Sequence, residues 1–309
     1  MRQGIRRFFR YARLRHEAYL AKQAGVPIGK QSRDPILNQY RFTNVFRELD
    51  KTTAWFRKYV REPLRDKPEV LLATVLFRLL NRIEVGEAIF CQTFMTDEGG
   101  LNTAFEKYAK DGNTAHLRIA VHQFVGKKGP HCTGAYIISS PPGYSKLDGV
   151  LKIVDDFNRK SDWRHWTDCD PAGNECTLEA AWEFLKDNKY FGPFHSYEMV
   201  TDLRHTALLE RAPDVMTWAS VGPGCRRGLN RVMGRDKRDH AVKTADMLDE
   251  MRELLAHSRN TEFWPNLGHS KNAAQWPRWE MREVEHTLCE FDKYERVRLG
   301  EGRPRGVYR

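Results

Sequence analysis

The sequence lacks a hydrophobic run long enough to cross a membrane. Its longest apolar stretch, Val70–Phe77, ends at Arg78, whereas a transmembrane helix needs about 20 apolar residues. A secretory signal is not expected either, because arginines recur from residue 2 to residue 15, where such a signal requires an apolar segment. We therefore expect a cytoplasmic protein, with an arginine-rich transit peptide as the alternative for the first residues.

Closely spaced cysteine pairs are also absent. The six cysteines include no C-x-x-C pair and are widely scattered: Cys91, Cys132, Cys169, Cys176, Cys225 and Cys289. This usage fits reduced thiols better than a disulfide framework. One loop gathers possible metal ligands, but their spacing matches no known site, so we expect an ordinary polar loop and no metal there. These residues are His165, Asp168, Cys169, Asp170 and Cys176.

Neither of two glycine-rich segments forms a nucleotide-binding loop. Gly25–Ser32 has three residues between its glycines and Gln31 after its lysine, whereas a P-loop requires four residues and a Ser or Thr. Gly222–Gly228 is one residue too long for the dinucleotide fingerprint. The sequence therefore argues against a P-loop kinase and against a Rossmann oxidoreductase.

Positive charge is present in excess, and it is concentrated at the two ends. The 309 residues hold 51 Lys and Arg against 41 Asp and Glu, a net charge of +10. Residues 1–41 carry +8 and residues 296–309 carry +4, which leaves −2 for the body. The basic N-terminal segment could bind nucleic-acid phosphates, form a solvated helix face, or lie on a membrane surface. We favour DNA phosphates, with Arg6, Arg7 and Arg10 as contacts.

The hydrophobic pattern predicts a mainly α-helical protein. Apolar periodicity predicts helices over 5–24, 42–59, 68–94, 178–186, 194–210, 214–220, 226–233, 239–257 and 278–298. A small β element is expected within 112–150, around Ala135–Ile138. We expect a basic N-terminal arm or helix at 1–40, a helical core at 41–262, and a C-terminal loop, helix and basic tail at 263–309.

The segment 177–209 predicts a helix-hairpin-helix that could present Lys189 and Gly192 to a DNA phosphate, although an ordinary turn between two helices is the alternative. Asp214 follows Gly192 at a spacing that resembles the catalytic Asp of helix-hairpin-helix DNA glycosylases, and it could equally cap a helix. The turn containing Gly222 and Gly224 leads directly into Arg226 and Arg227. That combination suits a bound phosphate or pyrophosphate.

Two rows of polar residues lie within helices that are otherwise apolar. Asn44, Arg47 and Asp50 form the first row, and Arg78, Asn81 and Glu84 form the second. Buried polar groups are costly unless they are paired, so each row implies a site or a salt-bridge network.

Five segments together resemble the phage α-glutamyl/putrescinyl-thymine pyrophosphorylases and the related helical domain of 5-hydroxymethyluracil DNA kinases. The resemblance covers about residues 40–305, and it is carried by Tyr40–Asp50, Phe77–Arg82, Phe191–Phe194, Trp218–Asn230 and Glu285–Tyr294. It implies a thymidine hypermodification enzyme of a bacteriophage, built on a glycosylase-like helical scaffold. In that pathway, an amino acid or polyamine displaces pyrophosphate from the 5-methylene of a modified uracil in double-stranded DNA.

This implied chemistry assigns roles to the candidate residues. Asp50, Glu84 or Asp214 would act as the general base. Arginines would hold the pyrophosphate, namely Arg47, Arg78, Arg82, Arg226 and Arg227. Asn44 and Asn81 would read the uracil edge, and Phe46, Trp55 or Trp218 would stack on an extruded base. No cofactor is predicted, apart from a divalent metal that pyrophosphate could require, and a DNA kinase of the same pathway is an expected partner.

Two other functions remain open at this point. A DNA glycosylase acting on a modified base would leave abasic sites. A helical module that binds DNA for a partner kinase would show no turnover.

Overall fold

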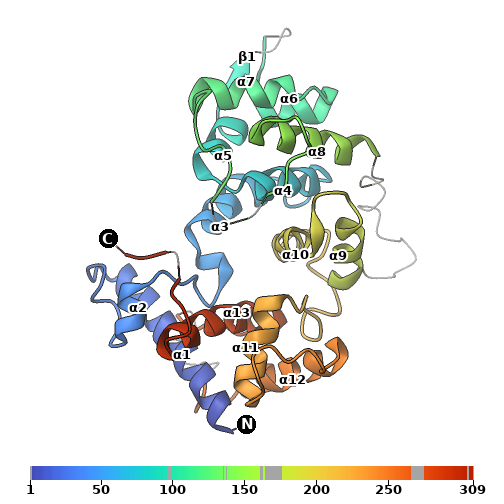
Figure 1. Cartoon of the computed structure of the whole chain (residues 1–309). Helices are drawn as coiled ribbons and strands as arrows, with labels where there is room; N and C mark the ends of the chain where they lie inside the picture. Colours follow the sequence, from blue (N-terminus) through green and yellow to red (C-terminus); the bar gives the residue numbers. More distant parts are fainter. Residues whose placement is uncertain are drawn as a thin grey trace. The chain divides into compact units, whose positions relative to one another are not determined.

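The computed structural model divides into two compact units, each described here by itself (Figure 1). Unit 1 contains residues 1–50 and 214–309, and unit 2 contains residues 51–213. This division cuts the chain near 50 and 213, whereas we predicted boundaries at 40 and 262. The structure describes residues 2–95, 99–134, 136, 138–160, 163, 176–265, 275–304 and 306–308.

Unit 1 is helical and draws on both ends of the chain. Its described elements are α1 (Arg2–Gln23), α2 (Pro35–Gln39), the 3₁₀ turn η1 (Arg47–Leu49), α11 (Pro223–Met233), α12 (Thr244–His257) and α13 (Met281–Arg298). Residues 306–308 pair with residues 39–41 through an antiparallel bridge between Tyr40 and Val307. The predicted basic tail is therefore held against the segment that follows α2.

Glycines allow three helices of unit 1 to pack closely. A Cβ atom added to Gly4 of α1 would lie 1.9 Å from the carbonyl oxygen of Val232. One added to Gly228 would lie 2.1 Å from the carbonyl oxygen of Leu288, and one added to Gly224 would lie 2.9 Å from the sulfur of Cys289. Gly224 therefore serves the contact between α11 and α13.

The apolar face of α1 is part of the core of unit 1. Ile5, Phe8, Phe9, Ala12 and Leu14 are all at most 3% exposed. Phe8 packs edge-on against Phe291 of α13. These side chains are covered by protein and are not available for insertion into a membrane surface. Among the described helices, none is both long and apolar enough to span a bilayer.

Unit 2 is built around two fully buried helices. Its described elements are α3 (Lys51–Phe56), the π-helical turn η2 (Arg57–Arg61), α4 (Glu69–Leu80), α5 (Ile83–Phe90), β1 (Thr93–Met95), β2 (Leu101–Thr103), α6 (Ala104–Asp111), α7 (Ala115–Phe124), α8 (Lys146–Lys160), α9 (Leu178–Lys186) and α10 (Gly192–Leu203). Every residue of α4 after Glu69 is buried, and so is every residue of α10 after Phe194. Helix α10 packs between α9 and α4.

The predicted β element was misplaced. Residues 115–124 form α7 and residues 146–160 form α8, whereas the antiparallel hairpin joins β1 to β2 before α6. Ala135 and Ile137 lie outside the described residues. The sequence TFM at β1 is too short for its alternation to be detected as a strand.

The predicted helix over 42–59 was wrong in its first half. Residues 41–44 have no regular structure, Arg47–Leu49 form only η1, and Asp50 at the end of that turn has extended backbone angles. The α-helix begins at Lys51. Asn44, Arg47 and Asp50 therefore do not share one helix side, although one hydrogen bond still joins the backbone N–H of Asn44 to Asp50.

The predicted helix over 68–94 breaks in the middle. Helix α4 ends at Leu80, and Asn81 adopts a left-handed conformation with φ of 49° before α5 starts at Ile83. Asparagine tolerates this conformation better than most residues, so it can end a helix without glycine. Arg78 and Glu84 consequently belong to different helices.

The prediction that two helices joined by a short connection lie within 177–209 is confirmed, since α9 and α10 form there. Thr177 caps α9, since its hydroxyl accepts a hydrogen bond from the backbone N–H of Ala180. Helix α10 ends at Leu203, seven residues before the predicted end. The predicted helix over 214–220 is instead a turn, in which the carbonyl oxygen of Asp214 accepts the N–H groups of Thr217 and Trp218.

The described cysteines differ in state. Cys91, Cys132, Cys225 and Cys289 are free thiols, but Cys176 is disulfide-bonded. The expectation of six reduced thiols was therefore wrong, because pairing follows proximity in the fold, which spacing along the chain does not determine.

Candidate functional site

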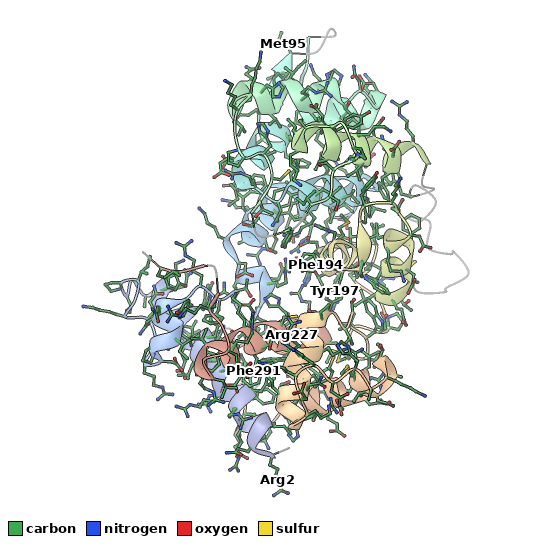
Figure 2. All side chains as sticks on the ribbon, in the orientation of Figure 1. Arg2, Met95, Phe194, Tyr197, Arg227 and Phe291 are labelled. Carbon is green, nitrogen blue, oxygen red and sulfur yellow. The ribbon has the colours of Figure 1, made fainter. Side chains whose placement is uncertain are left out.

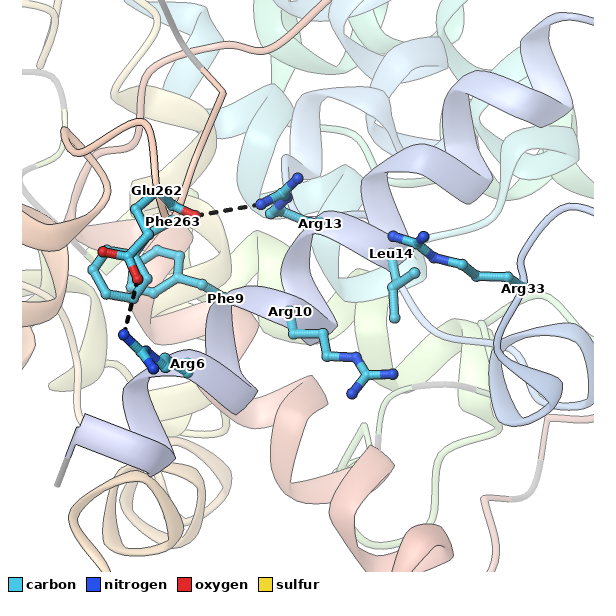
Figure 3. A pocket seen from close by; sticks show the side chains of 8 residues that line it. All are labelled: Arg6, Phe9, Arg10, Arg13, Leu14, Arg33, Glu262 and Phe263. Carbon is cyan, nitrogen blue, oxygen red and sulfur yellow. Dashed lines mark hydrogen bonds and ion pairs between the residues drawn. The ribbon is translucent and has the colours of Figure 1, made fainter.

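An arginine face runs along the exposed side of α1 in unit 1. Arg6, Arg10 and Arg13 follow one another at helical spacing, and Arg33 approaches from the segment after α1 (Figure 3). We call these four residues the arginine face. Together with Phe9, Leu14, Glu262 and Phe263 they line a pocket of about 430 Å³. Sequence reasoning found Arg6 and Arg10 but not Arg13 and Arg33.

Glu262 is the one acidic residue among those that line this pocket, and it neutralises little of the charge. Its carboxylate lies 3.2 Å from Arg6, but both side chains are more than half exposed, and such pairs are weak. Arg13 donates to the backbone carbonyl of Glu262 at 3.3 Å. Arg10 has no ion pair or hydrogen bond to a described residue. The arginine face is therefore a site where anionic oxygens can replace water.

A second basic hollow adjoins the arginine face through Arg10. It has a volume of about 210 Å³ and is lined by Arg7, Arg10, Tyr11, Tyr294, Glu295 and Arg298. Glu295 is buried and lies 3.9 Å from Arg7, while Arg298 donates two hydrogen bonds to it at 2.7 and 2.8 Å. Arg7 is therefore partly neutralised, and Arg10 is the better phosphate contact of the two.

Arg15 of α1, Asn44 and Asp50 form a hydrogen-bonded cluster in unit 1. Arg15 donates to the side-chain oxygen of Asn44 at 2.6 Å, and the amide nitrogen of Asn44 donates to the carbonyl of Leu49 at 2.9 Å. Both polar atoms of the Asn44 side chain are thus occupied. Asn44 therefore holds the turn before α3 in place, and its role in reading the uracil edge stays a prediction.

Asp50 is the titratable group of this cluster. Its Oδ1 accepts the backbone N–H of Asn44 at 2.9 Å. Burial raises the pKa of Asp50 to about 6, although Asn44, Arg47 and Arg15 favour the charged form. A carboxylate with this pKa accepts protons near neutral pH, as a general base must. Asp50 is the candidate base whose environment fits the role.

Glu84 and Asp214 have less distinctive surroundings. The side chain of Glu84 is 63% exposed and lies 3.4 Å from Arg82. Asp214 is half-buried and uses its carbonyl oxygen to hold a turn. Neither the exposure of Glu84 nor the turn at Asp214 indicates that the residue acts as a general base.

The polar residue Arg78 is enclosed in a buried network of unit 2. Its guanidinium binds both carboxylate oxygens of Asp202, with one distance of 2.7 Å, and donates to Thr53 at 3.1 Å and to Asn81 at 3.0 Å. Arg61, also 1% exposed, lies 3.7 Å from the same carboxylate. Arg78 is fully engaged and does not face solvent, so its geometry is that of a structural network.

The remaining predicted arginines lie on two different units. Arg82 is in unit 2, beside Glu84, whereas Arg226 and Arg227 start α11 in unit 1. Arg226 donates to the carbonyl of Val242 at 2.9 Å. Arg227, labelled in Figure 2, donates to the buried Asp292 at 2.9 Å. Gly222 caps α11 with open space around it.

The expected stacking residues are mostly enclosed. Phe46 and Trp218 are buried, and Phe46 contacts Trp264 and His16. Trp55 is half-buried and stacks on Phe77. These rings build the cores of their units, and Trp55 alone keeps an exposed part.

Sequence reasoning missed a polar row on α10. His195, Glu198 and Asp202 are all buried and lie at positions i, i+3 and i+7. The same periodicity argument that selected Arg78 could have found them.

The segments that would have held the dismissed metal site lie mainly outside the described residues. Within the described part, no three His, Cys, Asp or Glu side chains gather closely enough to bind a metal.

Comparison with known proteins gives one clear family. The sequence model for the family described as "5-hmdU DNA kinase, helical domain" matches residues 2–303. A curated 5-hmdU DNA kinase of Bacillus phage SP10 is 26% identical over 211 residues, which cover 64% of this chain and 31% of that protein. The chain thus spans about a third of this relative's length. No solved structure matches significantly, so the likeness to helix-hairpin-helix DNA glycosylases stays a prediction.

Proposed function

The chain belongs to the family of the helical domain of 5-hmdU DNA kinases, and from this membership we propose that it modifies thymidine derivatives in double-stranded DNA. The proposed reaction is the displacement of pyrophosphate from a 5-pyrophosphomethyl uracil by an amino acid or a polyamine. The family match over residues 2–303 is the observation that carries the proposal. The sequence has no P-loop pattern, which favours the transfer step over the kinase step within this chain.

The reaction forms one bond and breaks one. The amine nitrogen forms a C–N bond with the 5-methylene carbon, the C–O bond to the pyrophosphate breaks, and the leaving group takes the electron pair. The nitrogen then has to lose a proton. Asp50 is our candidate acceptor, since its raised pKa lies close to neutral pH.

DNA binding is assigned to the arginine face. DNA phosphates would replace water around Arg6, Arg10, Arg13 and Arg33, releasing counterions from the duplex. Arg226, in the same unit as Asp50, is our candidate for the pyrophosphate, because it is half-buried and keeps donors beyond its bond to Val242; Arg82 of unit 2 is the alternative to it. A DNA kinase that produces the pyrophosphorylated base is the expected functional partner.

Mass spectrometry of nucleosides tests the proposal. The protein is incubated with DNA carrying 5-pyrophosphomethyl uracil and with a panel of amines, and the DNA is then digested to nucleosides. Transfer predicts a heavier, aminated nucleoside and released pyrophosphate. Abasic sites would favour a glycosylase, and unchanged DNA bound by the protein would favour a binding module for a kinase.

The base assignment has a matched control within the chain. Asp50→Asn should lower the transfer rate by roughly 10²–10⁴-fold, the usual size of a general-base contribution. Glu84→Gln removes a carboxylate that is well exposed and should leave the rate within about twofold of wild type. If Asp50→Asn retains full transfer, Asp50 is not the base.

A further inference from the structure

A pocket beside the connection between α9 and α10 has no role in the proposed reaction. We call it the hairpin pocket, and it has a volume of about 580 Å³. It is lined by Tyr136, Ser139, Tyr190, Phe191, Gly192, Pro193, Phe194 and His195. None of these described lining residues carries a charged side chain. Its size lies in the range of small-molecule sites, and its chemistry suits a neutral, flat ligand.

Aromatic rings form the walls of the hairpin pocket. The rings of Tyr136 and Phe194 meet edge-on at 5.0 Å between centroids. The hydroxyl of Tyr136 donates to Glu198 of α10 at 2.6 Å, which fixes the ring of Tyr136 against the hairpin. Phe194, labelled in Figure 2, lines the pocket and is 51% exposed, which is unusual for a phenylalanine. These rings offer flat faces to a ligand that can stack.

A residue that lines the pocket, His195, has one buried polar atom without a hydrogen-bond partner among the described residues. His195 is 6% exposed, and its Nε2 makes no hydrogen bond within the described structure. The other ring nitrogen, Nδ1, lies 3.0 Å from the carbonyl oxygen of Phe191 and must therefore donate its proton there. Burial lowers the pKa of His195, so the ring is neutral and Nε2 carries a lone pair. A ligand with an N–H donor would satisfy this atom.

Lys189 and Tyr190 lie in the connection between α9 and α10, and Tyr190 also lines the pocket. The ammonium group of Lys189 lies 5.2 Å from the ring centroid of Tyr190. Tyr190 has φ of 77°, a left-handed conformation that a bulky residue adopts at a cost. Lys189 is exposed and can pair with a phosphate attached to a ligand held in the pocket.

We propose that the hairpin pocket binds one unstacked pyrimidine of a DNA strand, with Phe194 stacking on the ring, Nε2 of His195 accepting its N3–H group, and Lys189 contacting its phosphate. The identity of the ligand as DNA rests on the proposed function. Because Phe194 lies edge-on to His195 at 5.4 Å and is half-exposed, its ring can turn outward and stack on the entering base.

Binding of the full chain to bulged DNA tests this proposal. The probes are a duplex with one unpaired thymine, the same duplex with N3-methylthymine at that position, and a fully paired duplex. Wild type should bind the thymine bulge about tenfold more tightly than the paired duplex, given the usual strength of base–aromatic stacking. N3-methylation should reduce this preference, because the methylated base still stacks but has no N3–H donor for Nε2 of His195.

Two variants test whether the preference for the bulge depends on the hairpin pocket itself. Phe194→Leu should lose most of the preference for the bulge and leave binding to paired DNA unchanged. Phe124→Leu removes another exposed phenylalanine of unit 2, on α7, and should keep the preference. Equal binding of the bulge by wild type and Phe194→Leu would overturn the proposal. Competition by free thymidine monophosphate at the strength of the bulged strand would overturn the assignment to a DNA strand.

The outcomes distinguish this proposal from the proposed function. If the bulge preference depends on Phe194 but no aminated nucleoside forms, the pocket stands and the transfer reaction fails. If amination occurs and Phe194→Leu changes neither the preference nor the KM for DNA, the transfer reaction stands and the pocket proposal fails.

Discussion

Arg78 and Asp202 form a two-point salt bridge in the interior of unit 2. Both side chains are at most 2% exposed, and the second hydrogen bond between them measures 2.7 Å. Arg61 lies near the same carboxylate, so two guanidinium groups share one buried negative charge. Removing that charge would leave the buried guanidinium of Arg78 without its carboxylate partner.

Loss of Asp202 should therefore destabilise the fold strongly. We expect Asp202→Asn to lower the free energy of unfolding of unit 2 by roughly 3–5 kcal/mol, the usual cost of breaking a buried ion pair. Denaturant titration of wild type and variant measures this loss of unfolding free energy. Glu84→Gln, which breaks the exposed pair with Arg82, should change stability by less than about 0.5 kcal/mol. Equal small effects from both variants would contradict the structural role of the Arg78–Asp202 pair.

The close approach of α11 to α13 gives a second prediction. A Cβ at residue 228 would lie 2.1 Å from a backbone oxygen of α13, so Gly228→Ala has to separate the two helices. We expect a loss of roughly 2–3 kcal/mol in unfolding free energy, which is typical of overpacking. Gly222→Ala meets no atom within 4 Å and serves as the control in the same thermal melts.

Asp50 should make stability depend on pH. Its pKa of about 6 in the fold exceeds its ordinary value of 3.8, so the fold favours the protonated form. The resulting stabilisation is fully present below pH 3.8 and is lost as the pH rises through 6. The free energy of unfolding should fall by at most about 3 kcal/mol over this range. Asp50→Asn should thus gain stability over wild type at pH 8 and little at pH 4. The same gain at both pH values would show that the pKa of Asp50 is not raised.

The arginine face should determine how steeply DNA binding depends on salt. Each phosphate contact that is lost reduces the slope of log K against log salt by about 0.9. Arg10→Gln should produce such a reduction, because Arg10 is exposed and has no partner among the described residues. Arg159→Gln, an exposed arginine of unit 2, is the control and should leave the slope unchanged. Deleting α1 is not a useful test, since its apolar side chains belong to the core of unit 1.

The sequence predicted the helices better than the positions where they break. Long apolar periodicity located α1, α9 and α13 to within a few residues. The break at Asn81 was not predicted, because no glycine or proline lies there to indicate the end of a helix. Asparagine ends α4 instead, by adopting a left-handed conformation. The turn before Lys51 was missed because Asn44 and Asp50 stabilise it through side-chain hydrogen bonds that apolar periodicity does not report.

The candidate site could be predicted only in part, for a similar reason. Positive charge at the N-terminus identified Arg6 and Arg10, which are exposed, because charge along one helix face is visible in the sequence. Whether a buried arginine is free or paired depends on residues distant in the chain. Asp202 lies 124 positions from Arg78, and no local pattern links them.

The central claim is tested most directly by counting products in one reaction. The protein is incubated with DNA containing 5-pyrophosphomethyl uracil and an isotope-labelled amine, and pyrophosphate and labelled nucleoside are quantified together. The account predicts one pyrophosphate released for each labelled nucleoside formed, with turnover that rises as pH increases through about 6. Intact pyrophosphorylated nucleoside after complete binding of the DNA, or abasic sites in its place, would contradict it.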